Sequence, residues 1–218
     1  MLSLASKLKT EFVYGLMDNN KKIIDSRKKP DYFFQTKENG LRKFIKNCPA
    51  NSSCIFISKK HYFSSGGCNE SFISPDQVLF LRLFSKGNGI FLKEIVALLP
   101  SSDQIKGRLS TQIKRSRYES ILALIKFCED NRNIDKNIKK WAYKRAASRT
   151  YNYYKYFNKS FFSIYLLYYL SSKFFFPSNF IDNMYRFLEV FKGDRKKRPK
   201  NWITGSDKAA ISKVKIRI

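Results

Sequence analysis

The chain has 218 residues, of which 43% are hydrophobic and 16% aromatic, and this is too apolar for a disordered protein. Its 43 Lys and Arg outnumber 17 Asp and Glu, which gives a formal net charge of +26. A surplus of this size predicts a polyanionic partner. With only six Pro and nine Gly, the composition excludes collagen-like and linker-like chains.

The first hundred residues predict a small mixed α/β region, because short apolar runs alternate there with Gly, Pro, Asn and Ser. The run Cys54–Ile57 is short and contains β-branched residues, which predicts a buried strand. Leu41–Lys46 predicts a helical turn or a short helix. The other apolar runs are Glu11–Leu16, Tyr32–Phe34, Val78–Phe84 and Ile90–Leu99.

Two turn signals lie within this region. The pair Ser74-Pro75 is a helix-start signal, since a cap followed by proline costs no hydrogen bond there. The run Val78–Phe84 that follows fits either a helix or a strand. Gly87-Asn88-Gly89 predicts a hairpin turn before Ile90.

From Ser101 onward the pattern is helical. Ser101-Ser102-Asp103 offers caps and an acidic first turn, and apolar residues at steps of three and four predict one or two helices over Asp103–Asp130. After a break at Asn131–Asp135, a basic amphipathic helix is expected over Ile138–Phe157. Pro177–Gly193 predicts a further helix.

These patterns predict an α+β fold: a small mixed N-terminal region followed by a mainly α-helical basic C-terminal region. The expected parts are a mixed α/β region with a cysteine cluster at residues 1–100, a helical bundle at 101–193 and a basic tail at 194–218. Residues 1–100 carry a net charge of +8 and residues 101–218 carry +18. The second half is therefore expected to contact the polyanion.

The segment Ser160–Ser172 is free of charge for 13 residues. A membrane span needs about 20 apolar residues, so this segment is too short to cross a bilayer. Basic residues flank it at Lys155, Lys159 and Lys173. We expect a buried core helix, and the alternatives are a membrane-surface segment and a partner interface.

Cys48, Cys54, His61 and Cys68 form a candidate zinc set with the spacing C-x5-C-x6-H-x6-C. Tetrahedral zinc takes four such nitrogen and sulfur ligands. The set contains no close pair of cysteines that would direct two thiolates at one ion. Free buried cysteines and an ordinary histidine are therefore the alternative, and no cofactor besides this structural zinc is expected.

The sequence offers little for catalysis. It has one His, and it contains none of the motifs H-x-E, D-x-D, G-x-x-x-x-G-K-[ST] or G-x-S-x-G. Metal-dependent nucleases and polymerases need several converging carboxylates. We therefore expect a protein that is not an enzyme and that has no small-molecule substrate.

Basic residues interleaved with aromatic residues are the clearest binding signal. Lys and Arg neutralise phosphates, and aromatic faces stack on unpaired bases. The alternative for each cation is a solvated helix face or, near the C-terminus, a solvated tail. The candidate nucleic-acid-binding residues are Lys106, Arg108, Lys114, Arg115, Arg117, Lys139, Lys140, Lys144, Arg145, Arg149, Arg195, Lys196, Lys197, Arg198, Lys200 and Trp202.

The layout of a cysteine-bearing N-terminal part and a helical basic part resembles the large-subunit-like component of type IV CRISPR effector complexes. Cys48, Cys54 and Cys68 stand where that family often carries a zinc-binding module, although the family's C-x2-C pairs are lacking here. The resemblance implies a non-enzymatic subunit that sits at the 5′ end of the guide RNA, beside other protein subunits, and contacts target-adjacent DNA. In such complexes the protein grips phosphates and base pairing supplies sequence specificity.

Three other classes share the charge and the lack of catalytic motifs. A ribosomal or organellar ribosome protein would bind ribosomal RNA, and a plasmid or viral replication protein would bind DNA. A membrane-surface protein would use residues 160–176, although a membrane partner is not expected. Four unevenly spread cysteines and the lack of an apolar signal segment in residues 1–17 predict a cytoplasmic location.

Overall fold

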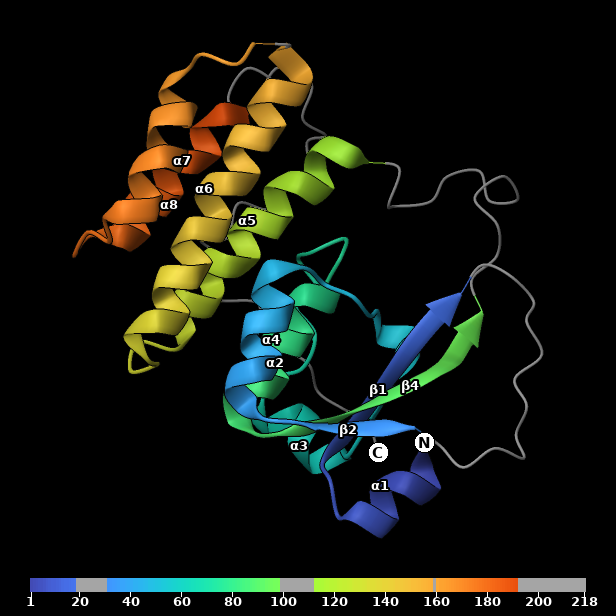
Figure 1. Ribbon diagram of the computed structural model, residues 1–218. Coiled ribbons are helices and arrows are strands. Elements are labelled where there is room, and N and C mark those ends of the chain that lie inside the picture. The colour runs from blue at the N-terminus through green and yellow to red at the C-terminus, as the bar shows by residue number, and fades with distance from the viewer. Residues whose placement is uncertain (19–30, 99–111, 159, 192–218) are drawn as a thin grey trace.

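The computed structural model describes residues 1–18, 31–98, 112–158 and 160–191. They form eight α-helices and one four-stranded mixed sheet (Figure 1). The α+β fold class predicted from the sequence is confirmed. None of the helices in the described residues is long and apolar enough to cross a membrane.

The sheet has the strand order β2-β4-β1-β3. Its two central strands, β1 and β4, run parallel, whereas β2 pairs with β4 and β3 pairs with β1 in antiparallel fashion. The parallel pair has Val13 opposite Ile90, and both side chains are buried. The strands are β1 (Phe12–Asp18), β2 (Tyr32–Gln35), β3 (Ile55–Ile57) and β4 (Gly89–Leu98).

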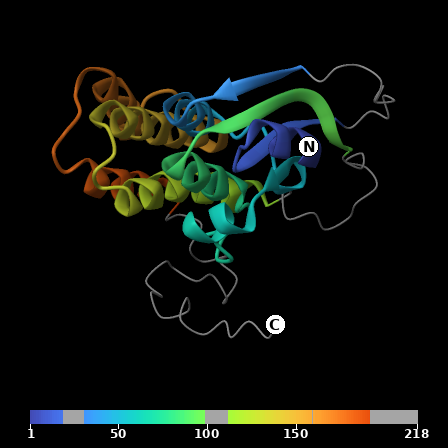
Figure 2. The same cartoon turned by 90° about the horizontal axis from the view of Figure 1, so that it is seen from below.

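Four helices accompany the sheet and four more follow it. Figures 1 and 2 show the later four gathered into a bundle on one side of α2 and α4, with the sheet on the other side. The helices of the first group are α1 (Leu2–Leu8), α2 (Lys37–Lys46), α3 (Lys59–Ser64) and α4 (Asp76–Lys86). The bundle consists of α5 (Ile113–Asp130), α6 (Lys136–Asn158), α7 (Ile164–Phe174) and α8 (Phe180–Phe187).

One hydrophobic core joins the sheet to the bundle. The aromatic rings of Phe44 from α2 and Phe80 from α4 stack with centroids 4.2 Å apart, and Tyr14 from β1 meets both edge-on. The same buried cluster continues without interruption to Phe187 and Phe191. This cluster includes residues from both sides of residue 100, because α4 packs on α2 and on α5.

The strand predicted over Cys54–Ile57 is present as β3, although its residues are half-buried rather than buried. The break at Asn131–Asp135 separates α5 from α6 as expected. The ambiguous run Val78–Phe84 is helical, since α4 begins at Asp76, directly after the proline. The predicted hairpin turn before Ile90 is wrong: Gly87 ends α4 with a hydrogen bond to the Leu83 carbonyl, and the chain then enters β4. The helix start expected at Ser101–Asp103 lies outside the described residues.

The expectation that Ser160–Ser172 is a buried core helix is wrong. This segment contains α7, whose one buried residue is Ser172. The helix packs on the bundle through tyrosines: Tyr165 lies against Tyr154, Tyr169 stacks on Tyr151, and Tyr168 contacts Phe187. Because tyrosines occupy the inner face, Ile164, Leu167 and Leu170 of α7 face outward.

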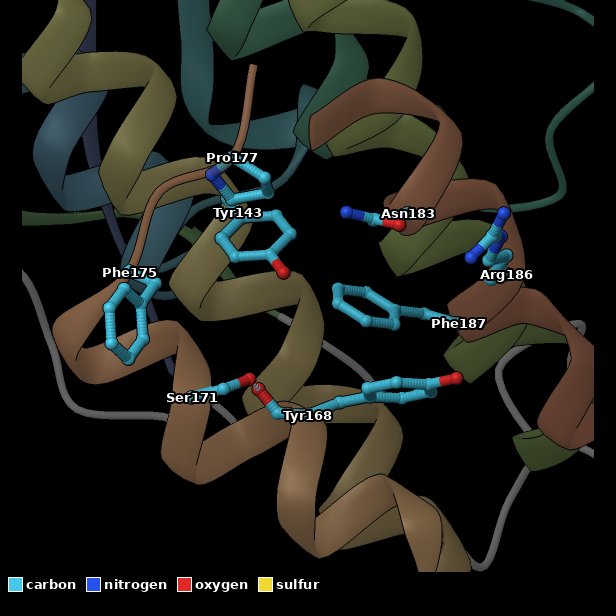
Figure 3. Close-up of a pocket in the computed structure, with 8 residues that line it drawn as sticks. All are labelled: Tyr143, Tyr168, Ser171, Phe175, Pro177, Asn183, Arg186 and Phe187. Atoms are coloured by element: carbon cyan, nitrogen blue, oxygen red, sulfur yellow. Dashed lines mark hydrogen bonds between the residues drawn. The ribbon is translucent and has the colours of Figure 1, made fainter. Parts of the chain in front are cut away.

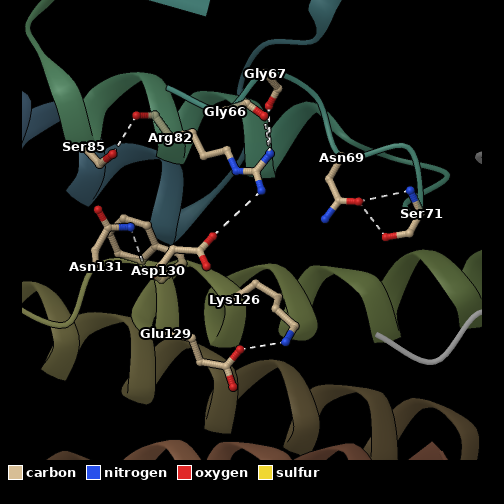
Figure 4. A network of polar contacts seen from close by, with 11 residues as sticks. Gly66, Gly67, Asn69, Ser71, Arg82, Ser85, Lys126, Glu129, Asp130 and Asn131 are labelled. Carbon is tan, nitrogen blue, oxygen red and sulfur yellow. Dashed lines mark hydrogen bonds and ion pairs between the residues drawn. The ribbon is translucent and has the colours of Figure 1, made fainter. Parts of the chain in front are cut away.

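Charged contacts tie the α3–α4 connection to the bundle (Figure 4). Arg82 donates to the carbonyls of Gly66 and Gly67 and lies 3.8 Å from the Asp130 carboxylate. Both glycines have positive φ, at 88° and 57°, so the turn that presents these carbonyls favours glycine. On the next turn of α5, Lys126 pairs with Glu129 at 2.7 Å. Cations on this side of the molecule are thus matched by acids.

Gly40 of α2 tests the packing of α2 on α4. An added Cβ would lie 2.1 Å from the Phe84 ring, so Gly40→Ala should lower the free energy of unfolding by about 2 kcal/mol through overpacking. Helix propensity alone predicts a gain of roughly 1 kcal/mol. Urea denaturation distinguishes the two signs. Asn39→Ala, at an exposed site of the same helix, is the control and should stay within about 0.5 kcal/mol of wild type.

Candidate nucleic-acid interface

A hollow of about 240 Å³ lies between α2 and α6. It is lined by Arg42, Ile45, Lys46, Trp141, Lys144, Arg145 and Ser148, and we call it the α2–α6 hollow. Its lining therefore has four cations, one indole and no carboxylate. Two cations predicted from the sequence, Lys144 and Arg145, lie here beside two cations from the N-terminal half of the chain, Arg42 and Lys46.

Helical spacing explains why these side chains meet. Arg42 and Lys46 are four residues apart in α2, so they share one face of that helix. On α6, steps of three and four residues bring Trp141, Lys144 and Ser148 to one face. The Arg42 guanidinium lies over the Trp141 ring, 4.5 Å from its centroid, which is within the range of a cation–π contact.

Arg145 has unused hydrogen-bonding capacity. One terminal nitrogen donates to Asn47 Oδ1 at 2.8 Å, but the buried Nε has no hydrogen-bond partner. Burial lowers the pKa of Arg145, and the positive charge of Arg117 lowers it further. No described carboxylate forms an ion pair with Arg145, so an anion bound beside its terminal nitrogens would relieve the repulsion from Arg117.

Arg149, one turn further along α6, has a structural role instead. Its guanidinium donates to the side chain of Gln77 at 3.1 Å and to the carbonyls of Ser120 at 2.5 Å and Ile45 at 3.3 Å. These bonds join α6 to α4, α5 and α2. Burial, with the nearby charge of Arg145, lowers the pKa of Arg149 to about 9. The Arg149 side chain therefore uses its hydrogen bonds to hold these helices together, and these donors are not available to a phosphate.

Several other predicted cations have partners within the protein. Arg115 pairs at 2.9 Å with the buried carboxylate of Glu119. Lys139 donates to the Arg132 carbonyl at 2.6 Å. Lys114 lies over the Phe157 ring at 5.3 Å. These contacts hold helix ends and connections in place.

The remaining predicted residues divide into two groups. Arg117 is exposed on α5, and its charge lowers the pKa of Arg145. Lys140 is half-buried on α6, one turn before Lys144. The others lie outside the described residues: Lys106, Arg108, Arg195, Lys196, Lys197, Arg198, Lys200 and Trp202.

Sequence reasoning missed Arg42 and Lys46. A signal was present, because both fall at four-residue spacing within the short helix predicted over Leu41–Lys46. What the sequence does not show is that α2 packs beside α6, about a hundred residues later in the chain. Charge counts by region assigned the polyanion surface to the second half alone.

The predicted zinc set is not assembled. Among the described residues, no group of three or more His, Cys, Asp or Glu could hold a metal ion. Cys54 is buried in the core, and the Cys48 thiol donates to the Ala50 carbonyl. His61 stacks on Phe12 with ring centroids 5.4 Å apart. Burial raises the pKa of Cys48 to about 12, so this thiol stays protonated at neutral pH.

A second hollow, of about 260 Å³, lies between α7 and α8 (Figure 3). Aromatic residues make half of its lining, and Ser171, Asn183 and Arg186 add polar side chains. The hydroxyl of Tyr143 points into it, as the close-up shows. The lining residues are Tyr143, Tyr168, Ser171, Phe175, Pro177, Asn183, Arg186 and Phe187.

Comparison with known proteins returned no match: no family model, no curated protein and no solved structure is significantly similar to this chain. The resemblance to the type IV CRISPR component therefore stays a prediction.

The structural role of Arg149 can be tested by Arg149→Lys. A lysine keeps the charge but cannot reach three acceptors from one planar group, so the free energy of unfolding should fall by about 2 kcal/mol. Arg117→Lys, the same change at an exposed position, should shift it by less than about 0.5 kcal/mol. Chemical denaturation measures both. Equal stability of the two variants would show that the Arg149 bonds do not hold the helices together.

Proposed function

We propose that this protein is a non-enzymatic nucleic-acid-binding protein that grips the sugar-phosphate backbone at the α2–α6 hollow. The observation that carries the proposal is the gathering of Arg42, Lys46, Lys144 and Arg145 around Trp141 without a carboxylate in the lining. Each cation can neutralise a phosphate, and the release of counterions from the nucleic acid favours binding.

The charge around the hollow favours a long polyanion over a small anion. No Asp or Glu occurs from residue 136 to residue 181, whereas nine Lys and Arg do. Lys140 and Lys144 stand one turn apart on α6, and Arg117 lies nearby on α5. A chain of phosphates can contact such a row in succession, whereas a single small anion neutralises one or two charges.

The hollow supplies binding groups rather than catalytic ones. Its lining has cations, an indole and a hydroxyl, but no His, Asp or Glu to act as a general base. The lack of catalytic motifs in the sequence supports the same conclusion. A role as a subunit that binds and positions nucleic acid fits these residues.

Within this function, a subunit of a guide-RNA ribonucleoprotein is the narrower hypothesis, and it rests on the resemblance alone. A ribosomal protein and a plasmid or viral replication protein are the alternatives. Purification from the native cell, followed by sequencing of the bound nucleic acid, separates them. Short RNAs with a common end support the guide-RNA subunit, ribosomal RNA supports the ribosomal protein, and bound DNA supports the replication protein.

The hollow itself is tested by the triple variant Arg42→Gln, Lys46→Gln, Lys144→Gln. With labelled single-stranded RNA and DNA at about 0.1 M salt, affinity should fall by about tenfold or more. The slope of log K against log salt should become shallower by about 2, since each lost phosphate contact contributes about 0.7. Fluorescence anisotropy over a salt series measures both quantities.

The matched control is Lys59→Gln, Lys60→Gln, Lys86→Gln, which removes the same charge from exposed positions on α3 and α4. It should change affinity by less than about threefold, because it alters only the general field of the protein. If both triple variants lose affinity equally, net charge alone drives binding and the hollow is not the site.

A further inference from the structure

The outward face of α7 is apolar. Ile164, Leu167, Leu170 and Phe174 recur at helical spacing and are 52%, 60%, 41% and 77% exposed. Phe162, just before the helix, is 85% exposed. These residues, together with Phe161 and Phe175, form what we call the α7 face. A contiguous apolar surface of this kind marks an interaction site.

The helix is reversed relative to an ordinary surface helix. Its inner face carries Tyr165, Tyr168 and Tyr169, which contact α6 and α8, while Ile164, Leu167 and Leu170 are exposed to solvent and Leu166 is half-buried. Burying leucine and exposing tyrosine would be the favourable choice if water covered the outer face. The pattern therefore indicates that something apolar covers the α7 face.

Lysines flank the α7 face, and the one acid whose charge acts on a described residue of α7 is Glu189, beside Tyr165 on the inner face. Lys155 lies over the Phe161 ring at 4.2 Å, and Lys173 lies over the Tyr169 ring at 4.6 Å. Long lysine side chains beside exposed aromatics can reach headgroup phosphates while the rings enter the acyl boundary. The second hollow adjoins this face, since Phe175 belongs to both, and its Arg186 adds another cation.

We propose that the α7 face docks on the surface of an anionic lipid bilayer. The helix has 11 residues and is therefore about 16 Å long, roughly half of the hydrocarbon thickness of about 30 Å. It lies in the plane of the interface, with its phenylalanines and leucines among the upper acyl chains and the lysines at the phosphates. Surface attachment agrees with the lack of a membrane-crossing helix among the described residues.

Two other occupants fit less well. A second copy of the chain would bring Lys155 and Lys173 toward their equivalents across the apolar contact, where like charges repel. Unpaired bases stack on aromatic rings, but the middle of the face is aliphatic at Ile164, Leu167 and Leu170 and offers no ring.

The test is vesicle flotation with nuclease-treated, full-length protein. Wild type should float with phosphatidylcholine vesicles that contain about 30% phosphatidylserine, and should float far less with phosphatidylcholine alone. In the double variant Leu167→Asp, Phe174→Asp, the fraction of protein bound to vesicles should fall by about tenfold or more. Both positions are exposed, so the fold should persist, as circular dichroism would verify.

The control is Leu2→Asp, Phe63→Asp, which makes the same charge change at apolar positions that are equally exposed but lie on α1 and α3. This variant should keep vesicle binding close to wild type. Equal loss in both variants would overturn the proposal, because net charge would then explain the attraction. The proposal would also be overturned if the wild type did not bind anionic vesicles, or if light scattering showed a dimer that the α7 variant disrupts.

Nucleic-acid affinity, measured in parallel, should be the same in the two variants. A failure of the membrane proposal therefore does not affect the proposal for the α2–α6 hollow.

Discussion

The hydrogen bonds of the half-buried Arg149 guanidinium are the interaction on which the arrangement of the helices depends. The guanidinium is bonded to carbonyls of α2 and α5 and to the side chain of Gln77 on α4, which in turn donates to the Phe44 carbonyl at 2.9 Å. A buried cation without an ion-pair partner is costly, and only a full set of acceptors offsets that cost. The network therefore fixes the distance between α2 and α6, and with it the hollow.

The distribution of acids decides which cations are available to a ligand. Glu119 and Glu129 are already paired with Arg115 and Lys126, and Asp130 lies near Arg82. The lining of the α2–α6 hollow contains no acid that could neutralise its four cations, so the positive charge of the lining is uncompensated. Local neutralisation, rather than the count of cations in a segment, separates structural lysines and arginines from binding ones.

The bundle thus presents two different surfaces along α6. Its N-terminal half, with Trp141 and Lys144, faces α2 and forms the basic hollow. Its C-terminal half, with Tyr151 and Tyr154, supports α7 and holds the apolar α7 face outward. Both surfaces suit an anionic partner, one through phosphates alone and the other through phosphates beside apolar chains. A single straight helix of 23 residues is long enough to carry both.

The sequence by itself determined the fold class, the position of β3 and the break before α6, because hydrophobic periodicity and turn residues act locally. It also determined the net charge of +26, which does not depend on the fold and from which a polyanionic partner is predicted. The prediction that Ser160–Ser172 forms a buried core helix was wrong, because the apolar pattern does not show whether the tyrosines or the leucines face the core. Only the tertiary structure decided that Arg42 meets Arg145, that Arg149 is internal and that the four zinc candidates stay apart. Those outcomes depend on contacts between residues distant in the chain, which local patterns do not encode.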